Sequence, residues 1–404
     1  MKATATFALL LAACAAVPQP PPPPPTEGVR VGVAFDASVE RGSFAEGLAD
    51  PSTGRRATID DPVRIASVSK LIVAIGAMKL VEQGKLSLDR DVSELLGWRL
   101  RNPAFPERPI TLRMLLSHTS SLRDGDDAYV VALGQSLSQA LADPAVWEAA
   151  HGPGAGYFTY ANFNFPVIAS LIERATGERF DLWMRREVLV PMRIDACFNW
   201  PTCSDTAVAR AVVLTQDGKP VRDDLGGQRP DCPVFVREGE PCDLGRWKLG
   251  DNGALFSPQG GLRISARGLA RVGRMLLGGG TLDGIRILSP TSINWMLSAQ
   301  WSFDGANGLT ESGFHCRYGL ATQLLATRQP GCADDPERKG RQWVGHAGEA
   351  YGLRSGLWID RRRGLGVAYF VTGLPADPPR GKSAWRAAEE QAFDRAAGLL
   401  DKPR

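Results

Sequence analysis

The sequence predicts an α/β fold of the α+β type, in which an antiparallel sheet carries helices on both faces and an all-helical lobe is inserted. Two short strand-like runs, residues 29–35 and 44–50, come first. Helical patterns then occupy the middle of the chain, and strand-like runs return near the C-terminus before a closing amphipathic helix. If strands from both ends of the chain share one sheet, the helical middle becomes an insertion.

The most apolar helix begins at Ser67-Val68-Ser69-Lys70 and ends before Gly84, a residue type suited to the position after a helix. Its apolar residues lie on nearly all sides, which predicts that it is buried. Lys70 is unusual there, because a cation in the first turn opposes the helix dipole and burial lowers the pKa of an amine. Ser67 lies on the same helix face, so Lys70 could activate its hydroxyl as a nucleophile. The alternative is a chance match whose lysine extends to solvent.

A short helix is expected near residues 92–96, and Thr111 can cap another over residues 112–116. The polar turn at residues 117–121 follows it and contains His118. His118 is a candidate base, but a histidine in a turn rich in Ser and Thr more often binds backbone groups. The structural role is therefore the preferred prediction for His118.

Tyr160 and Asn162 lie between a glycine-rich loop, residues 152–156, and a helix that runs to residue 176. Polar side chains at such a junction can point into a cleft. The alternatives are a half-buried aromatic ring for Tyr160 and a helix N-cap for Asn162.

Residues 196–250 are rich in Gly, Pro, Asp and Cys and carry little periodicity, which is typical of a long excursion at the rim of a site. Six cysteines follow residue 190. Residues 1–13 predict a signal peptide and so an exported chain, in which an even number of cysteines indicates disulfides. They form three local couples, although this pairing is one of fifteen possible connectivities. The couples are Cys197 with Cys203, Cys232 with Cys242, and Cys316 with Cys332. None has the spacing of metal ligands, and the four histidines are dispersed, so no metal or other cofactor is expected.

Regular structure is predicted to return after residue 260. Ser265 can cap a helix to residue 277, and the pair Ser289-Pro290 can open another. Strands are expected at residues 344–348, 353–360 and 364–372, the last two joined as a hairpin, and a closing helix at residues 383–400.

The N-terminus predicts export. Residues 1–13 have the short apolar core of a signal peptide, and Cys14 follows at once. Leu11-Ala12-Ala13-Cys14 resembles the lipobox of bacterial lipoproteins, which implies that Cys14 becomes the lipidated first residue. The alternative is an ordinary cleavage site with Cys14 incidental. We expect residues 14–27 to form a proline-rich linker and residues 28–404 to form the folded domain. The protein would then lie on the periplasmic side of a bacterial membrane, held by its lipid anchor. A net charge of +3 without a basic block gives no indication of nucleic-acid binding.

Four stretches occur in order along the chain: residues 64–70 (RIASVSK), 110–120 (ITLRMLLSHTS), 160–162 (YAN) and 345–348 (GHAG). Together they resemble the serine β-lactamase and penicillin-binding protein superfamily, in particular its class C and D-alanyl-D-alanine carboxypeptidase branch. The resemblance covers most of residues 30–400. It implies the β-lactamase/transpeptidase-like fold, which is the sheet with an inserted helical lobe.

The resemblance also implies roles for individual residues. Ser67 would form an acyl-enzyme, Lys70 would take its proton, and Tyr160 would relay a proton to the leaving group. Asn162 would bind the acyl side of the substrate. His346, where many relatives have lysine, would orient Tyr160 and add positive charge.

Three further positions would shape the substrate site. Gly348 would let the substrate lie close to the strand, and the N–H groups of Ser67 and Glu349 would form the oxyanion hole. Ala347 stands where penicillin-recognising members have a hydroxyl that binds the substrate carboxylate. The nearby Arg354 could supply charge instead, if its side chain faced the cleft.

These features predict a serine hydrolase that cleaves an amide or ester, with D-amino-acid peptides, as for a D-Ala-D-Ala carboxypeptidase, as the first substrate class. One alternative is a β-lactamase that hydrolyses β-lactam antibiotics. The other is a catalytically silent penicillin-binding or sensor protein, which loss of Ser67, Lys70 or Tyr160 would have favoured.

Overall fold

The computed structural model describes residues 28–401. The predicted signal peptide, Cys14 and the linker to residue 27 lie outside the described residues. Among the described helices, none is both long and apolar enough to cross a membrane.

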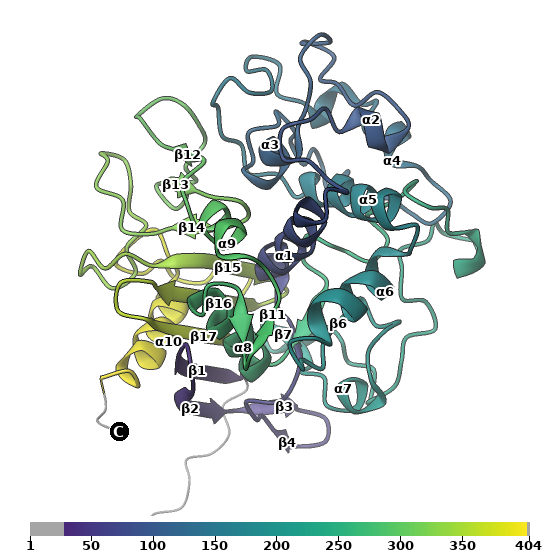
Figure 1. Cartoon of the computed structure of the whole chain (residues 1–404). Helices are drawn as coiled ribbons and strands as arrows, with labels where there is room; N and C mark the ends of the chain where they lie inside the picture. Colours follow the sequence, from purple (N-terminus) through teal and green to yellow (C-terminus); the bar gives the residue numbers. More distant parts are fainter. Residues whose placement is uncertain (1–27, 402–404) are drawn as a thin grey trace, which may run out of the picture.

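An eight-stranded antiparallel sheet forms one side of the molecule (Figure 1). Its strand order is β12-β13-β14-β15-β16-β17-β1-β2, so the two N-terminal strands pair with the last C-terminal strand. This confirms the predicted joining of both chain ends in one sheet. The strands are β1 (Arg30–Asp36), β2 (Glu40–Glu46), β12 (Trp301–Ser302), β13 (Arg317–Tyr318), β14 (Gln323–Leu324), β15 (Val344–Ala350), β16 (Leu353–Asp360) and β17 (Leu365–Val371).

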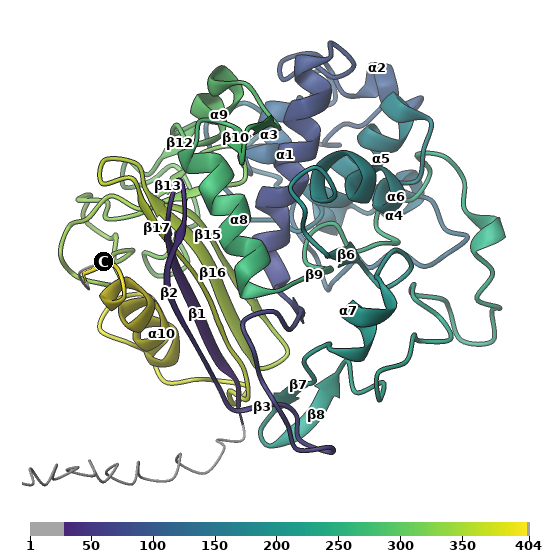
Figure 2. The same ribbon diagram turned by 60° about the horizontal axis from the view of Figure 1, so that its bottom comes forward.

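Helices α8 (Ala266–Leu277) and α10 (Ala387–Gly398) cover opposite faces of the sheet (Figure 2). Both pack against β1, β16 and β17, so each face of the sheet contributes to its own hydrophobic cluster. Strand β16 is buried along its whole length, as expected for a central strand covered on both sides. The Ser265 hydroxyl caps α8 as predicted.

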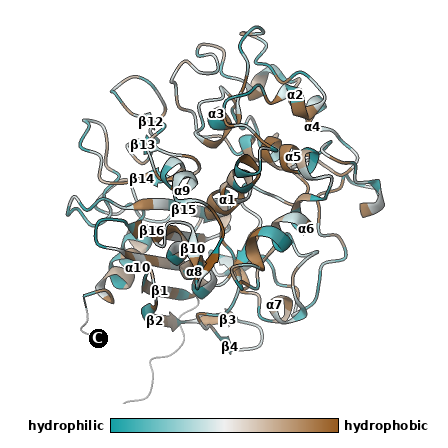
Figure 3. Cartoon of the chain, viewed as in Figure 1, coloured by the Kyte–Doolittle hydropathy of each residue, from teal (hydrophilic) through white to brown (hydrophobic). Residues whose placement is uncertain are grey.

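Helix α1 (Ser69–Glu82) joins the sheet to the helical lobe, where α5 (Asn164–Thr176) packs against it. Eleven of its fourteen residues are buried, which confirms the prediction from its apolar character. Hydrophobic residues concentrate on α5 and the central strands, whereas many surrounding loops are hydrophilic (Figure 3). The other helices are α2 (Ser93–Leu96), α3 (Leu112–Leu116), α4 (Leu137–Ala140), α6 (Phe180–Met184), α7 (Asp205–Ala209) and α9 (Pro290–Met296).

Several predicted boundaries are wrong. The run at residues 44–50 contains the end of β2 and a separate strand, β3 (Leu48–Asp50), which pairs with β4 (Arg55–Arg56). Gly47 divides the two with a φ of +91°, a backbone conformation that suits glycine and interrupts a strand. The closing helix begins at Ala387 rather than at residue 383. Strands β12 to β14 were not predicted, because segments of two residues carry no detectable alternation.

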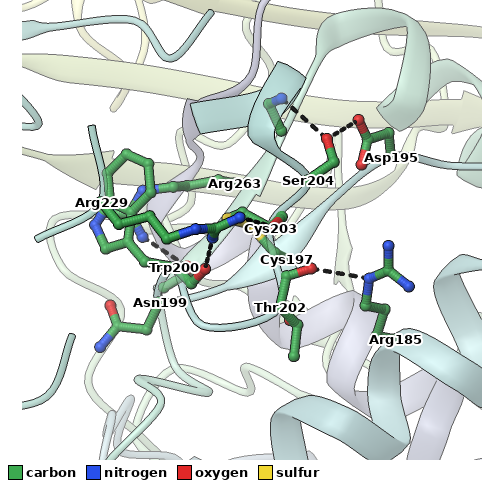
Figure 4. The surroundings of a disulfide bond; sticks show 12 residues. Arg185, Asp195, Cys197, Asn199, Trp200, Thr202, Cys203, Ser204, Arg229 and Arg263 are labelled. Carbon is green, nitrogen blue, oxygen red and sulfur yellow. Dashed lines mark hydrogen bonds between the residues drawn. A yellow bond between two sulfur atoms is a disulfide. The ribbon is translucent and has the colours of Figure 1, made fainter. Parts of the chain in front are cut away.

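The excursion at residues 196–250 contains little regular structure, as predicted. It includes β6 (Cys197–Phe198), β7 (Leu214–Gln216) and β8 (Lys219–Arg222), and β6 pairs with β9 (Leu262–Ile264). The remaining short strands are β5 (Val63–Arg64), β10 (Thr281–Leu282) and β11 (Ile285–Arg286). All six cysteines form the three predicted local disulfides. The bond from Cys197 to Cys203 closes a short loop that contains Trp200 (Figure 4).

Candidate active site

Ser67 lies in a single 3₁₀ turn, Ala66–Val68, immediately before α1. Ala66 has a φ of +50°, an unfavourable conformation for a residue with a Cβ, and such strain concentrates at functional sites. The hydroxyl of Ser69 donates to the Ala66 carbonyl oxygen (2.7 Å) and accepts from the Leu262 N–H (3.1 Å). These bonds fix the turn that carries Ser67.

Lys70 is fully buried, and its Nζ contacts three acceptors. These are the Ser67 Oγ (2.9 Å), the Asn162 Oδ1 (2.7 Å) and the carbonyl oxygen of Gln259 (2.9 Å). Burial lowers the pKa of Lys70 to about 7, against the opposing charges of Asp124 and Glu311. A lysine that is substantially neutral near pH 7 has a lone pair that can accept the Ser67 hydroxyl proton.

Asp124 is hydrogen-bonded to Asn162 and so belongs to the same site as Lys70. The sequence did not predict this role for Asp124. Its carboxylate accepts from the Asn162 Nδ2 (2.8 Å) and from the Phe163 N–H (3.1 Å). Asn162 therefore bridges Lys70 and Asp124 and uses both of its polar atoms in doing so. Burial raises the pKa of Asp124, while its hydrogen bonds and Lys70 oppose that shift. No motif marks Asp124, since an aspartate in a turn rich in Asp and Gly has an ordinary local explanation.

The pKa of Lys70, which the charge of Asp124 raises, predicts how kcat/KM depends on pH. Only neutral Lys70 can accept a proton, so kcat/KM should fall as the pH drops below about 7. The Asp124 carboxylate favours the charged lysine and raises its pKa. Asp124→Asn should therefore lower the pKa of Lys70 and move the acidic limb of the pH profile down by roughly one unit.

The measurement is a pH profile of kcat/KM for a neutral ester, with Asp126→Asn as the matched control at an exposed aspartate. A limb that stays in place or moves upward in Asp124→Asn would contradict the assignment of this limb to Lys70.

Tyr160 is hydrogen-bonded to Ser67, and burial raises the pKa of its phenol far above the ordinary value. Tyr160 therefore stays protonated at neutral pH and is suited to donating a proton. Its ring is stacked between two imidazoles, His118 at 4.4 Å and His315 at 4.8 Å between ring centroids. This sandwich holds the phenol beside Lys70, whose Nζ lies 5.0 Å from the centre of the same ring.

His118 has the structural role preferred from the sequence. Its Nδ1 accepts from the Ala161 N–H (3.0 Å), and its carbonyl oxygen accepts from the Thr159 N–H (3.0 Å). Burial and the charge of Lys70 hold its pKa well below the ordinary value, so the ring is neutral. His118 thus positions the segment that carries Tyr160.

His315 was missed as a neighbour of the site. Its Nδ1 accepts from the Gln323 Nε2 (3.0 Å), while the Oε1 of the same amide accepts from the Ala347 N–H (2.9 Å). Since Nδ1 accepts, Nε2 carries the proton, and it faces the Glu311 carboxylate at 3.5 Å. A hydrogen-bonded chain therefore links β15 to the ring that packs on Tyr160. From the sequence, His315 was merely one of four dispersed histidines.

His346 differs from its expected role in two respects. Its Nε2 accepts from the Tyr318 hydroxyl (2.8 Å), and its Nδ1 donates to the Ala347 carbonyl oxygen (2.5 Å), so its hydrogen bonds do not reach Tyr160. Burial lowers the pKa of His346 to about 3, and the charge of Lys70 acts in the same direction. The expectation of positive charge is therefore wrong, because the ring is neutral at physiological pH.

Strand β15 also departs from the expected substrate contacts. Ala347 packs in the hydrophobic cluster on the α10 side of the sheet and does not line the cavity beside Ser67. A Cβ on Gly348 would meet the Ile65 carbonyl oxygen at 2.4 Å and the Ser67 nitrogen at 3.2 Å. The glycine thus lets β15 approach the Ser67 turn, rather than making room for substrate. Glu349 lines the cavity and forms an ion pair with Arg354.

Arg354 does not supply charge to the site. It is not among the residues that line the cavity, and its charge acts on Tyr369 and Glu389, which belong to the α10 side of the sheet. The arginines that line the cavity are instead Arg64, Arg222 and Arg263.

A cavity of about 540 Å³ opens beside Ser67 and is walled largely by the excursion at residues 196–250. Asn162, Gln259 and Glu349 also line it, whereas Tyr160 and His346 do not. Within residues 28–401, no group of three or more His, Cys, Asp or Glu side chains could hold a metal ion. The cavity contains the partly exposed Ser67 and has the size of a pocket for a small molecule.

The sheet, the helical lobe and the group of Ser67, Lys70 and Tyr160 define a class of protein, the hydrolases with a β-lactamase/transpeptidase-like fold. The chain belongs to the Beta-lactamase family, which matches residues 23–392.

Relatives in this family differ in what they do. Penicillin-binding protein 4 of Amycolatopsis lactamdurans is 26% identical over 250 residues, 62% of this chain and 60% of that protein. The alignment thus spans less than two thirds of that relative. The esterase EstB of Burkholderia gladioli is 27% identical over 349 residues, 80% of each protein. The class C β-lactamase structure from Rhodobacter sphaeroides has a TM-score of 0.65 at 16% identity, covering 93% of this chain and 95% of that chain, and shows the shared fold.

Proposed function

We propose that this protein is a serine hydrolase that cleaves an ester or amide through an acyl-enzyme on Ser67. The observation that carries the proposal is the buried Lys70 Nζ, 2.9 Å from the Ser67 Oγ, with a pKa lowered to about 7. A buried lysine at this distance from a serine hydroxyl is the arrangement of an activated nucleophile.

The reaction begins when neutral Lys70 accepts the Ser67 proton and the Oγ forms a bond to the substrate carbonyl carbon. Negative charge develops on the carbonyl oxygen, which the N–H groups of Ser67 and Glu349 would stabilise. Tyr160 donates its proton to the leaving alcohol or amine as the scissile bond breaks, and Lys70 returns a proton to Tyr160. Water then hydrolyses the acyl-enzyme and releases the carboxylic acid and free Ser67.

An ester is the first substrate class to test, because the esterase relative aligns over 80% of both proteins. Peptides ending in D-amino acids and β-lactams are the alternatives. The neutral His346 and the inward packing of Ala347 argue against a carboxylate site at β15 like that of penicillin-recognising members.

The test uses the domain of residues 28–404 and its Ser67→Ala variant, assayed with para-nitrophenyl hexanoate and with benzylpenicillin while intact mass is followed. We expect ester turnover that depends on Ser67, with a transient hexanoyl adduct. Equal turnover by Ser67→Ala would contradict the proposal. A Ser67-dependent penicilloyl adduct without turnover would favour the carboxypeptidase alternative, and penicillin turnover would favour the β-lactamase.

We also propose that the protein is exported and held on the periplasmic side of the membrane through Cys14. Three disulfides within the folded domain support the export proposal, since such bonds persist in oxidising compartments.

A further inference from the structure

Two arginines face the cavity beside Ser67 without a carboxylate partner. Arg64 and Arg222 both line this cavity, and within residues 28–401 neither forms an ion pair. Most other arginines near the site are paired with acids, so these two cations are available to a ligand. Charged guanidinium groups in a partly enclosed wall bind anions more strongly than they would in open solvent.

Arg64 is nine-tenths buried and lies three residues before Ser67. Its polar contact is the Asn199 Oδ1 at 3.3 Å, and its Nε has no hydrogen-bond partner although it is buried. Arg64 also lies 5.4 Å from the centre of the Tyr351 ring. A buried guanidinium with an unsatisfied N–H is costly unless a ligand completes its hydrogen bonds.

Arg222 reaches the same point from the end of β8. Its guanidinium donates to the Tyr351 hydroxyl (2.8 Å) and lies 4.5 Å from the centre of that ring. Burial alone would raise the pKa of Tyr351, but the two arginines outweigh it and lower the pKa below the ordinary value. The field at the Tyr351 hydroxyl therefore stabilises negative charge.

The turn that carries Tyr351 is itself strained. Tyr351 has a φ of +54° and is followed by Gly352 at +69°. A tyrosine in the left-handed region is unusual, and such strain concentrates at functional sites.

The other charges of the cavity wall are accounted for. Arg263 pairs with Asp223 at 2.6 Å. Its guanidinium also lies over the Trp200 ring, 3.8 Å from the ring centre (Figure 4). Glu349 is held by Arg354. Asp224 also lines the cavity and is exposed, as Arg222 is, but within residues 28–401 it forms no ion pair with either arginine, so two cations face one carboxylate. The net charge around the Arg64–Tyr351–Arg222 group is therefore positive.

The cavity also has an apolar rim. Val130, Val221 and Phe235 line it and are 45%, 43% and 53% exposed. A ligand with a short hydrocarbon segment could cover these residues while its charged end reaches the arginines.

We propose that the Arg64–Tyr351–Arg222 group is an anion subsite that selects substrates with a carboxylate at the end of a short apolar chain. This inference rests on the proposed function, since it names the substrate class of the Ser67 site. The subsite lies in the wall formed by β8 and the turn after β15, away from Ala347.

The test compares two esters that differ in one terminal group, para-nitrophenyl hexanoate and mono-para-nitrophenyl adipate. Wild-type protein should prefer the adipate monoester by roughly 10-fold in kcat/KM, and Arg222→Gln or Arg64→Gln should each remove most of that preference. Lys219→Gln is the matched control, because Lys219 is exposed on the same strand β8 and does not line the cavity. The preference should also weaken at high salt.

Binding of both esters to the Ser67→Ala variant, measured by calorimetry, separates this inference from the proposed function. Ester cleavage without any preference for the adipate monoester in turnover or binding would overturn the anion subsite and leave the hydrolase proposal intact. If neither ester is cleaved, but Ser67→Ala binds the adipate monoester more tightly in a way that requires Arg222, the subsite stands and the esterase activity fails. A preference equal in wild type, Arg64→Gln and Arg222→Gln would also overturn the subsite.

Discussion

Lys70→Arg should lower kcat/KM for ester cleavage by roughly 10³–10⁴-fold, because a guanidinium keeps the positive charge but cannot become a neutral base. The loss should appear in formation of the acyl-enzyme, so the hexanoyl adduct on Ser67 should accumulate more slowly in a time course of intact mass. Lys70→Met should be impaired to a similar extent, since it has neither charge nor base. Similar losses in both variants would show that catalysis requires the lone pair of the amine.

Lys79→Arg is the matched control on the same helix. Lys79 forms a partly buried ion pair with Glu187 at 3.2 Å, which arginine can also form, so activity should stay near the wild-type value. Thermal unfolding of all three variants would check that α1 remains folded. If Lys70→Arg retained activity within a few-fold of wild type, Lys70 would not be the base. Tyr160 would then become the candidate for the group that accepts the Ser67 proton.

The general architecture was predictable because it follows from local patterns. The caps at Thr111 and Ser265 mark helix starts, and the hairpin of β16 and β17 is encoded by two apolar runs with a polar turn between them. The β12–β14 edge was not predictable, because strands of two residues depend on pairing partners that are distant in the chain. The strand break at Gly47 was not predictable either, because it depends on the backbone of Gly28 and Val29, which lies close to Gly47 in the fold.

The site divides in a similar way. Ser67 and Lys70 are three residues apart in sequence, and the 3₁₀ turn that leads into α1 brings their side chains together. Asp124, His315 and Arg222 reach the site only through the tertiary fold, and each is an ordinary polar residue in its own segment. The charge of His346 was wrongly expected because its pKa depends on burial, which the sequence around it does not reveal.

Gly348→Ala should reduce kcat/KM by roughly 10²–10³-fold, because it separates the two proposed oxyanion donors. The new Cβ would lie 2.4 Å from both the Ile65 carbonyl oxygen and the Ser355 Oγ. The Ser355 hydroxyl donates to this same Ile65 oxygen (2.7 Å), so neither atom can move freely. Strand β15 must therefore shift away from the Ser67 turn. The distance between the N–H groups of Ser67 and Glu349 would change, and with it the support for the developing negative charge.

The measurement is single-turnover acylation with para-nitrophenyl hexanoate, accompanied by thermal unfolding, since overpacking also costs about 1–3 kcal/mol of stability. Gly398→Ala is the matched control, because Gly398 ends α10 and has no atom near the position of a new Cβ. That variant should keep full activity and gain slightly in stability from the helix preference of alanine. If Gly348→Ala is destabilised but acylates at the wild-type rate, β15 does not set the oxyanion geometry, and stabilisation of that charge must come from other donors.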